Sequence, residues 1–206
     1  MKKINIVGAG PGNENYLVEE GVQAIKRSTL IIGDSRLIHS VKNLLDKQEI
    51  YLLKKFSHLL EVLKEKDEEI TILVSGDTGF YSLLDFINRN ISGREINVIP
   101  GIASFQNLFS KLKKCWHNYL LMSLHGRDCD YIKLLEFSHS GVVLPTDREN
   151  TPHTIGKKLT ESGLGDLIVR VGENLSYENE KIYWFYAKDY DNHKEFSMNI
   201  VIIEKG

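Results

Sequence analysis

Short apolar runs and amphipathic segments alternate along the first half of the chain. The apolar runs, each bounded by glycine or polar residues, predict buried strands at 3–7, 30–32, 50–53, 70–74 and 96–99. Between them, apolar residues recur near helical spacing, which predicts helices at 16–27 and 56–66. Strands that alternate with helices at this spacing predict a mainly parallel sheet with helices on both faces.

The pattern changes around residue 112, after the polar and basic run Lys111–Lys114. Beyond it we expect helices at 130–137 and 151–162, and strands at 119–124, 141–144, 166–171, 182–186 and 199–203. The last two strands have no predicted helix between them, which favours antiparallel pairing and a mixed sheet. The predicted fold class is α/β with two domains, 1–111 around a mainly parallel sheet and 112–206 around a mixed one.

Composition narrows the class of partner. The chain has 206 residues, 42% of them hydrophobic, and a formal net charge of −2, which gives no general electrostatic case for binding nucleic acid or an anionic membrane. No apolar run approaches the roughly 20 residues of a membrane span, and the N-terminus turns into a strand and a glycine loop where a signal peptide would continue. Cys115 and Cys129 lack zinc-type partners, so we expect reduced thiols, a cytoplasmic location and no metal site.

Small residues follow three of the predicted strands, at Gly8–Asn13, Ser75–Tyr81 and Pro100–Phe105. Open α/β sheets bind ligands at the carboxyl ends of their strands, so these loops are the first candidates for a site. Asp77 either caps the helix that follows or presents its carboxylate to a ligand. Ser104 likewise either caps a helix or belongs to a loop whose N–H groups meet a nucleoside.

The first loop, Gly8-Ala9-Gly10-Pro11-Gly12, is similar to a dinucleotide-binding fingerprint but departs from it. Its third glycine comes one position too early for G-x-G-x-x-G, and Pro11 lacks the N–H that would face a pyrophosphate. Asp34 stands where an acidic ribose ligand could lie, but it does not restore the spacing. A nucleotide-binding oxidoreductase is therefore an alternative that the motif disfavours.

A fourth candidate segment, Leu121–Arg127, ends a strand of the second half. His125 sits at that strand end and fits a base, a ligand contact or a packed imidazole. Arg127 has the planar fork that binds carboxylates, although a surface ion pair explains it nearly as well.

Taken in this order, the four segments resemble the tetrapyrrole (corrin/porphyrin) methylase family. The runs Val74–Ser82, Pro100–Gln106 and Ser123–Arg127 look most like the C5-methyltransferases of cobalamin biosynthesis within that family. The resemblance implies an enzyme that transfers a methyl group from S-adenosylmethionine to C5 of a precorrin or cobalt-precorrin, leaving S-adenosylhomocysteine. Thr78 departs from the family pattern, which often has proline at this position.

The resemblance also implies roles for individual residues. Those expected on the methyl donor are Pro11, Gly76, Asp77, Phe80, Ala103, Ser104, His125 and Leu175. Asp77 and His125 are the candidates for a catalytic base, which this chemistry does not strictly require. Gly10 is expected to border the tetrapyrrole, and Arg36, Lys54 and Arg127 to bind its carboxylate arms.

Partners follow from the same resemblance. It implies a homodimer, and a separate enzyme for methylation at C15 and decarboxylation. The open alternative within the family is an enzyme for another ring position, or one that methylates ribosomal RNA or a protein side chain. An RNA enzyme should be more basic than this chain, and neither relative should carry the Leu124-His125-Gly126-Arg127 run. A non-catalytic binding module would not need four such loops.

Overall fold

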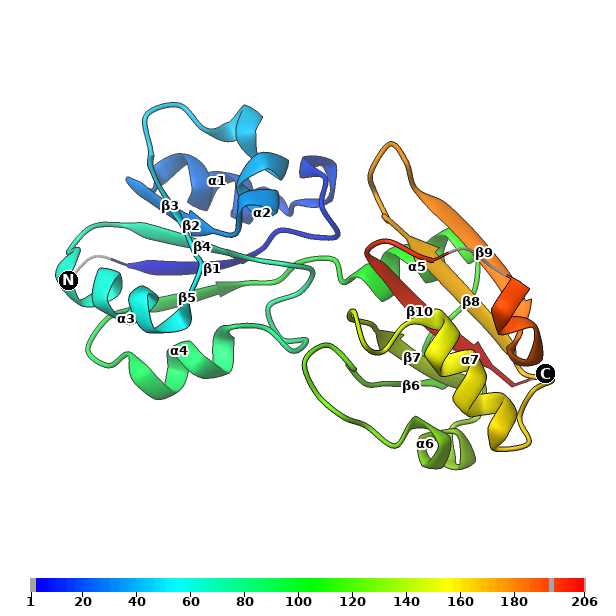
Figure 1. The fold of residues 1–206 in the computed structure, drawn as a ribbon. Helices are drawn as coiled ribbons and strands as arrows, with labels where there is room; N and C mark the ends of the chain where they lie inside the picture. The colour runs from blue at the N-terminus through cyan, green and yellow to red at the C-terminus, as the bar shows by residue number, and fades with distance from the viewer. Residues whose placement is uncertain (1–2, 193–194, 206) are drawn as a thin grey trace. The chain divides into compact units, whose positions relative to one another are not determined.

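The computed structural model describes residues 3–192 and 195–205 of the chain (Figure 1). The chain divides into two compact units, Met1–Ser104 and Phe105–Gly206. Each unit is built around its own five-stranded sheet. In the described part of the chain, no helix is long and apolar enough to cross a membrane.

The first unit is a sheet of five parallel strands in the order β3-β2-β4-β1-β5. Its strands are β1 (Ile4–Gly8), β2 (Leu30–Gly33), β3 (Glu49–Leu52), β4 (Ile70–Val74) and β5 (Ile96–Ile99). Its helices are α1 (Glu19–Arg27), α2 (Ser35–Ser40), α3 (Phe56–Glu65) and α4 (Leu84–Asn90), with 3₁₀ turns η1 (Glu14–Tyr16) and η2 (Lys42–Leu44).

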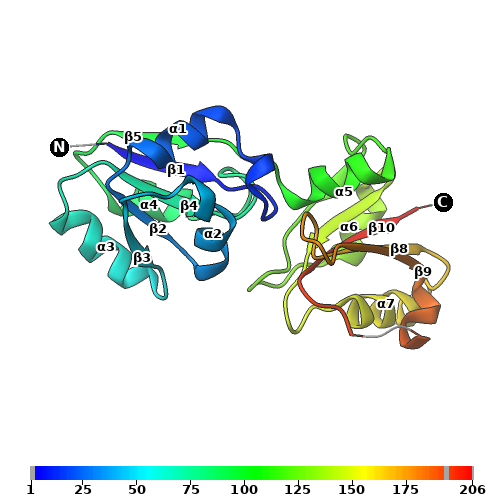
Figure 2. The same ribbon diagram turned by 90° about the horizontal axis from the view of Figure 1, so that it is seen from above.

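Helices cover both faces of this sheet, as the alternation of strands and helices predicts. Ile25 of α1 and Leu37 of α2 belong to the apolar cluster on one face, and Leu59 of α3 and Ile87 of α4 to the cluster on the other (Figures 1 and 2). The central strands β1, β2 and β4 are buried along their whole length. Strands buried on both faces are apolar without alternation, which is why the runs in the sequence are continuous.

The second unit has a mixed sheet in the order β6-β7-β10-β8-β9, in which only the pairing of β6 with β7 is parallel. Its strands are β6 (Tyr119–Leu121), β7 (Gly141–Pro145), β8 (Ile168–Glu173), β9 (Lys181–Tyr186) and β10 (Asn199–Glu204). Its helices are α5 (Ser104–Leu112), α6 (Tyr131–Phe137) and α7 (Pro152–Glu161), with the 3₁₀ segment η3 (Ala187–Asn192). The mixed sheet confirms the prediction, but β8 lies between β9 and β10, so these two strands do not pair with each other.

Helix α5 belongs with the second unit, whereas the predicted boundary after residue 111 assigns it to the first. Its apolar side packs on the second sheet. The ring centroids of Phe109 and Tyr119 lie 4.8 Å apart, and the Leu108 side chain packs over Gly172 of β8. The basic run that suggested a linker therefore marks the end of this helix. Helices α6 and α7 contribute Leu135 and Ile155 to the large apolar cluster of this unit.

A buried carboxylate lies within the second unit. Glu204 is 4% exposed and accepts hydrogen bonds from Lys114 Nζ (2.7 Å), Arg170 Nε (2.8 Å) and the Tyr119 hydroxyl (3.3 Å). Burial alone would raise the pKa of Glu204, but the hydrogen bonds from Lys114 and Arg170 outweigh it and hold that pKa below its usual range. Burial, and then the charge of Glu204, raise the pKa of Tyr119 to about 12.

Candidate functional site

The carboxyl edge of the first sheet carries the loops after β4, β1 and β5, which are adjacent strands. We call these loops, residues 8–13, 75–81 and 100–104, the glycine edge. Parallel strands end at the same side of a sheet, so loops that are far apart in the sequence meet here.

Gly8 and Gly101 let the three loops touch through their backbones. A Cβ on Gly8 would lie 2.5 Å from the Gly101 nitrogen and 2.7 Å from the Gly76 oxygen. A Cβ on Gly101 would lie 2.6 Å from the Gly8 oxygen and closer still to the Gly76 oxygen. Since all these neighbours are backbone atoms, no side chain fits at either position.

Gly10 and Gly76 join the first two loops by a small antiparallel bridge. The Gly76 N–H donates to the Gly10 oxygen (2.9 Å), and the Gly10 N–H donates to the Gly76 oxygen (3.2 Å). Both residues have positive φ, +69° and +67°, which favours glycine. Because Gly10 is held in this bridge and the loop leads into a 3₁₀ turn at Glu14, the geometry differs from a dinucleotide loop that opens directly into an α-helix.

Asp77 ties the second loop to the third. Its Oδ2 accepts from the Gly101 N–H (3.1 Å), and its Oδ1 accepts from the Gly79 N–H (2.8 Å). The helix after this loop begins only at Leu84, with Leu83 at the N-cap, so Asp77 does not cap it. The carboxylate organises two backbones of the glycine edge.

The other first-unit residues expected on the methyl donor lie along the same edge. Pro11 and Ala103 are buried, Phe80 is half-buried and packs edge-on against Tyr81, and Ser104 is the first residue of α5. At Gly76 an added Cβ would lie 3.5 Å from the Ala103 Cα and 3.9 Å from the Ser104 nitrogen. The missing side chain leaves this backbone uncovered, a cradle that suits a nucleoside with hydrogen-bonding groups along its edges.

Two of the basic residues follow neighbouring strands at this edge. Arg36, in the first turn of α2, donates from Nη2 to the Ser75 hydroxyl (3.1 Å), which sets its guanidinium beside the glycine edge. Lys54 is exposed and follows β3, the outermost strand on that side. Arg36 therefore lies next to the loops, and Lys54 farther out along the same side of the sheet.

In the second unit, His125 occupies a tight turn that we call the histidine turn, residues 124–127. The Arg127 N–H donates to the Leu124 oxygen (3.3 Å), and Gly126 has φ +66°, as a type II turn requires at its third position. His125 and Arg127 are exposed, and Leu124 is fully buried. The turn is thus anchored in the core at one end and presents both candidate side chains outward.

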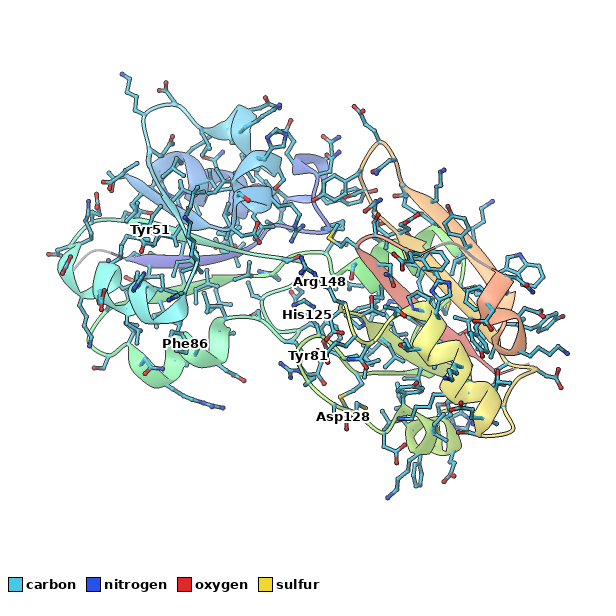
Figure 3. The ribbon with its side chains drawn as sticks, in the orientation of Figure 1. Tyr51, Tyr81, Phe86, His125, Asp128 and Arg148 are labelled. Carbon is cyan, nitrogen blue, oxygen red and sulfur yellow. The ribbon has the colours of Figure 1, made fainter. Side chains whose placement is uncertain are left out.

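The residues after β7 hold this turn. The Gly126 N–H donates to Asp147 Oδ2 (2.9 Å), and the His125 Nδ1 lies 3.2 Å from the Thr146 oxygen. Backbone hydrogen bonds from Asn150 and then Gly126 lower the pKa of Asp147 to about 2. A pocket of about 1130 Å³ opens here, lined among others by His125, Arg148 and Met198. His125 and Arg148 are labelled in Figure 3.

Leu175 is buried, at 4% exposed, between Asn174 and Ser176, which both have positive φ. Its side chain packs near Gly172 and Leu108, and the strained backbone conformations lie at Asn174 and Ser176 on either side of it. Non-glycine residues with positive φ gather at functional sites, which agrees with a role for this segment.

Sequence reasoning missed Thr146 and Asp147. The clue was present, because both are polar residues that follow the apolar run 141–144 and Pro145, at the end of a predicted strand as the first-half loops are. In residues 3–192 and 195–205 no cluster of three or more His, Cys, Asp or Glu side chains is arranged to hold a metal ion.

A family model described as Tetrapyrrole (Corrin/Porphyrin) Methylases matches residues 3–188. The chain is 33% identical to a protein of Methanocaldococcus jannaschii named probable cobalt-precorrin-7 C(5)-methyltransferase, over 98% of both chains. It is 26% identical to the cobalt-precorrin-7 C(5)-methyltransferase of Salmonella typhimurium, over 97% of this chain and 98% of that one. It is 22% identical to a decarboxylating precorrin-6Y C(5,15)-methyltransferase of a Sinorhizobium species, over 87% of this chain but only 44% of that protein.

Solved structures share the fold. The precorrin-6Y methylase of Archaeoglobus fulgidus superposes with a TM-score of 0.75 at 20% identity, over 100% of this chain and 98% of that one. The uroporphyrin-III C-methyl transferase of Thermus thermophilus, in complex with S-adenosylhomocysteine, superposes with a TM-score of 0.77 at 18% identity, over 98% and 96%.

Proposed function

The chain belongs to the tetrapyrrole (corrin/porphyrin) methylase family, and we propose that it methylates C5 of cobalt-precorrin-7 with S-adenosylmethionine in cobalamin biosynthesis. The observation that carries this is the match to a C5-methyltransferase at 33% identity over 98% of both chains. Matches over the full length leave no unaligned domain in that relative to supply a different activity. The oxidoreductase alternative rested on the first glycine loop, and the methylase family model includes that loop in its match to residues 3–188.

We propose that the glycine edge holds the methyl donor through Pro11, Gly76, Asp77, Phe80, Ala103 and Ser104, with His125 and Leu175 contributing from the second unit. The uncovered backbone beside Gly76 supports this assignment. When bound, S-adenosylmethionine supplies a methyl group on a sulfonium, which is strongly electrophilic. The chain's residues then have to align this group with the acceptor carbon and exclude water.

The two candidate bases have different surroundings. Both oxygens of Asp77 already accept backbone N–H groups, which supports a role in shaping the loops. The His125 Nδ1 faces a carbonyl oxygen, so Nε2 is the nitrogen that can meet a ligand. We therefore assign any proton transfer at the acceptor to His125, and the organisation of the donor cradle to Asp77.

Carboxylate arms of the macrocycle require cationic partners. We propose Arg36, Lys54 and Arg127 for this role, with Gly10 bordering the ring. The hydrogen bond from Arg36 to Ser75 supports the first of these, because it fixes the guanidinium at the rim of the glycine edge.

We also propose a homodimer. On the edge strand β9, Ile182, Trp184 and Tyr186 alternate along one face and are 37%, 56% and 41% exposed. An apolar stripe on an open strand edge is a surface that proteins usually cover. Size-exclusion chromatography with light scattering on Trp184→Glu against the unaltered protein tests this, and an unchanged monomeric mass in both would contradict it.

The remaining parts of the proposal concern compartment and pathway. Two free thiols, Cys115 and Cys129, support a cytoplasmic location. Two relatives named for C5 alone align over 98% of their length, which supports a separate protein for C15 methylation and decarboxylation. The net charge of −2 supports a small-molecule substrate over a nucleic acid or a membrane.

The direct test is incubation of the purified protein with cobalt-precorrin-7 and methyl-labelled S-adenosylmethionine. Mass spectrometry should find one added methyl, and isotope-edited NMR should locate it at C5. A methyl at another ring position would keep the family and replace the substrate assignment. No transfer to any corrin intermediate would reject the proposal.

A further inference from the structure

Thr146 and Asp147, the two residues that follow β7, each form a hydrogen bond to the histidine turn. The Asp147 carboxylate takes the Gly126 N–H at 2.9 Å, and the Thr146 carbonyl faces the His125 ring at 3.2 Å. Both contacts hold the pair His125-Gly126, the part of the turn that carries the candidate side chain.

Asp147 is itself tied down on its other side. Its Oδ1 accepts from the backbone N–H groups of Glu149 (3.0 Å) and Asn150 (2.7 Å) and from Asn150 Nδ2 (3.1 Å). Asn150 Nδ2 also lies 3.3 Å from the Leu124 oxygen, which links the two loops a second time. A carboxylate with this many N–H donors makes charge-assisted hydrogen bonds, which are stronger than neutral ones.

The Thr146 carbonyl determines which ring nitrogen of His125 is protonated. A carbonyl oxygen only accepts, so Nδ1 must donate, and in the neutral ring Nε2 then carries the lone pair. Thr146 is itself fixed by Asn199, because the Thr146 hydroxyl lies 2.8 Å from both the backbone oxygen and the side-chain oxygen of that residue.

Packing fixes only the Leu124 end of this turn. A Cβ placed on Gly126 would meet no heavy atom within 4 Å, and His125, Gly126 and Arg127 are all exposed. The exposed part is held by three hydrogen bonds: the Gly126 N–H to Asp147, the His125 ring to Thr146, and the His125 N–H to the Ser123 hydroxyl (3.2 Å). Removing the Asp147 carboxylate should therefore loosen the Gly126 side of the turn without opening the core.

We infer that Asp147 is a positioning residue, which fixes the His125-Gly126 backbone so that His125 offers Nε2 to the bound methyl donor. The inference rests on the proposed function for the ligand that His125 meets. Its structural half, that Asp147 holds the turn so that the His125 ring faces the Thr146 carbonyl and keeps one tautomer, stands independently of that ligand.

The carboxylate of Asp147 has two roles: Oδ1 organises its own loop through Glu149 and Asn150, and Oδ2 binds the Gly126 N–H of the histidine turn. The variant Asp147→Asn separates them. The amide oxygen can still accept from Glu149 and Asn150, but the amide nitrogen then faces the Gly126 N–H, and two donors repel each other. Asp147→Ser is a second variant, with a hydroxyl that reaches its own turn but is too short for Gly126. The matched control is Asp130→Asn at the N-cap of α6, where Asp130 accepts one backbone N–H and asparagine caps equally well.

The first readout is ¹⁵N NMR of the His125 ring, assigned with His125→Ala. The unaltered protein and Asp130→Asn should show the Nδ1–H tautomer, and Asp147→Asn and Asp147→Ser a mixture. An unchanged tautomer in folded Asp147 variants would overturn the inference.

The second readout is calorimetric titration with S-adenosylhomocysteine in a double-mutant cycle. Asp147→Asn should weaken binding about tenfold in the unaltered protein and add no further loss in His125→Ala. Equal losses in both backgrounds would show that Asp147 does not act through His125. If the unaltered protein does not bind S-adenosylhomocysteine at all, the proposed function fails, and the NMR comparison still decides whether Asp147 positions His125.

Discussion

The glycine edge and the histidine turn lie at strand ends of two different sheets, and they are fixed in opposite ways. At the glycine edge, Gly8, Gly76 and Gly101 bring three backbones into contact, and an added methyl group has no room at Gly8 or Gly101. At the histidine turn, space around Gly126 is open and side chains hold the backbone from outside. A site built from backbone contacts is coupled to the fold, whereas one built from side-chain hydrogen bonds can be altered separately.

The largest effect is expected from Gly101→Ala. The new Cβ would overlap the backbone oxygens of Gly8 and Gly76, which cannot move without shifting β1 and β4. We expect a loss of about 3 kcal/mol in the free energy of unfolding, measured by urea denaturation with far-UV circular dichroism. The control Gly163→Ala, where φ is +75° but no atom lies within 4 Å, should lose only about 1–2 kcal/mol. Equal losses would contradict steric coupling at the glycine edge.

The second-largest effect on stability is expected from Glu204→Gln, a change in the interior of the second unit away from the histidine turn. Glu204→Gln removes the charge that pairs with Lys114 and Arg170, and we expect a loss of about 2 kcal/mol because Lys114 is 39% exposed and partly rehydrated. Trp116 and Trp184 both lie in the second unit, so tryptophan fluorescence during urea unfolding reports this loss. Asp166→Asn, which breaks an exposed pair with Lys188, should change stability by less than about 0.5 kcal/mol. A similar small change in Glu204→Gln would mean that the buried network is not stabilising.

Asp77→Asn sharpens the comparison within the glycine edge. Asparagine keeps one acceptor and opposes the other N–H with its own amide, so one of the bonds to Gly79 and Gly101 is lost. We expect about 1 kcal/mol of destabilisation together with weaker S-adenosylhomocysteine binding. Asp147→Asn, by contrast, should weaken binding with a smaller loss of stability than Asp77→Asn. If Asp77→Asn weakened binding with no loss of stability, the distinction between the two regions would not hold.

The smallest effect is a pH dependence from Asp147. Its pKa is lowered to about 2 in the folded protein from an ordinary 3.8, so its ionised form stabilises the fold above pH 3.8. This contribution is lost as the pH falls from 3.8 toward 2, where the folded state also takes up the proton. Thermal unfolding at pH 4.5 and pH 2.5 should show a smaller acid shift in Asp147→Asn than in Asp130→Asn, and equal shifts would contradict the assignment.

The sequence anticipated the first sheet better than the second. The strands at 70–74 and 96–99 agree with β4 and β5 to the residue, because each is an apolar run closed by a polar or proline residue. The strand predicted at 119–124 ends at Leu121, although Met122 and Leu124 still donate to the Val143 and Pro145 oxygens. An apolar pattern indicates that the chain is extended and lies beside another strand, but it does not indicate the residue at which regular strand pairing ends.

The candidate site was predictable where it depends on residue type and not where it depends on strand order. Small residues after strands identified the three loops, but their contact at Gly8 and Gly101 follows from β1 lying between β4 and β5. The role of Asp147 depends on β6 and β7 being neighbours, which the sequence does not state.

The most direct measurement is calorimetric titration of the purified protein with S-adenosylhomocysteine and, separately, with NAD. We predict micromolar binding of S-adenosylhomocysteine, weakened in His125→Ala, and no binding of NAD. Binding of NAD without S-adenosylhomocysteine would contradict a methyl-donor site at the glycine edge.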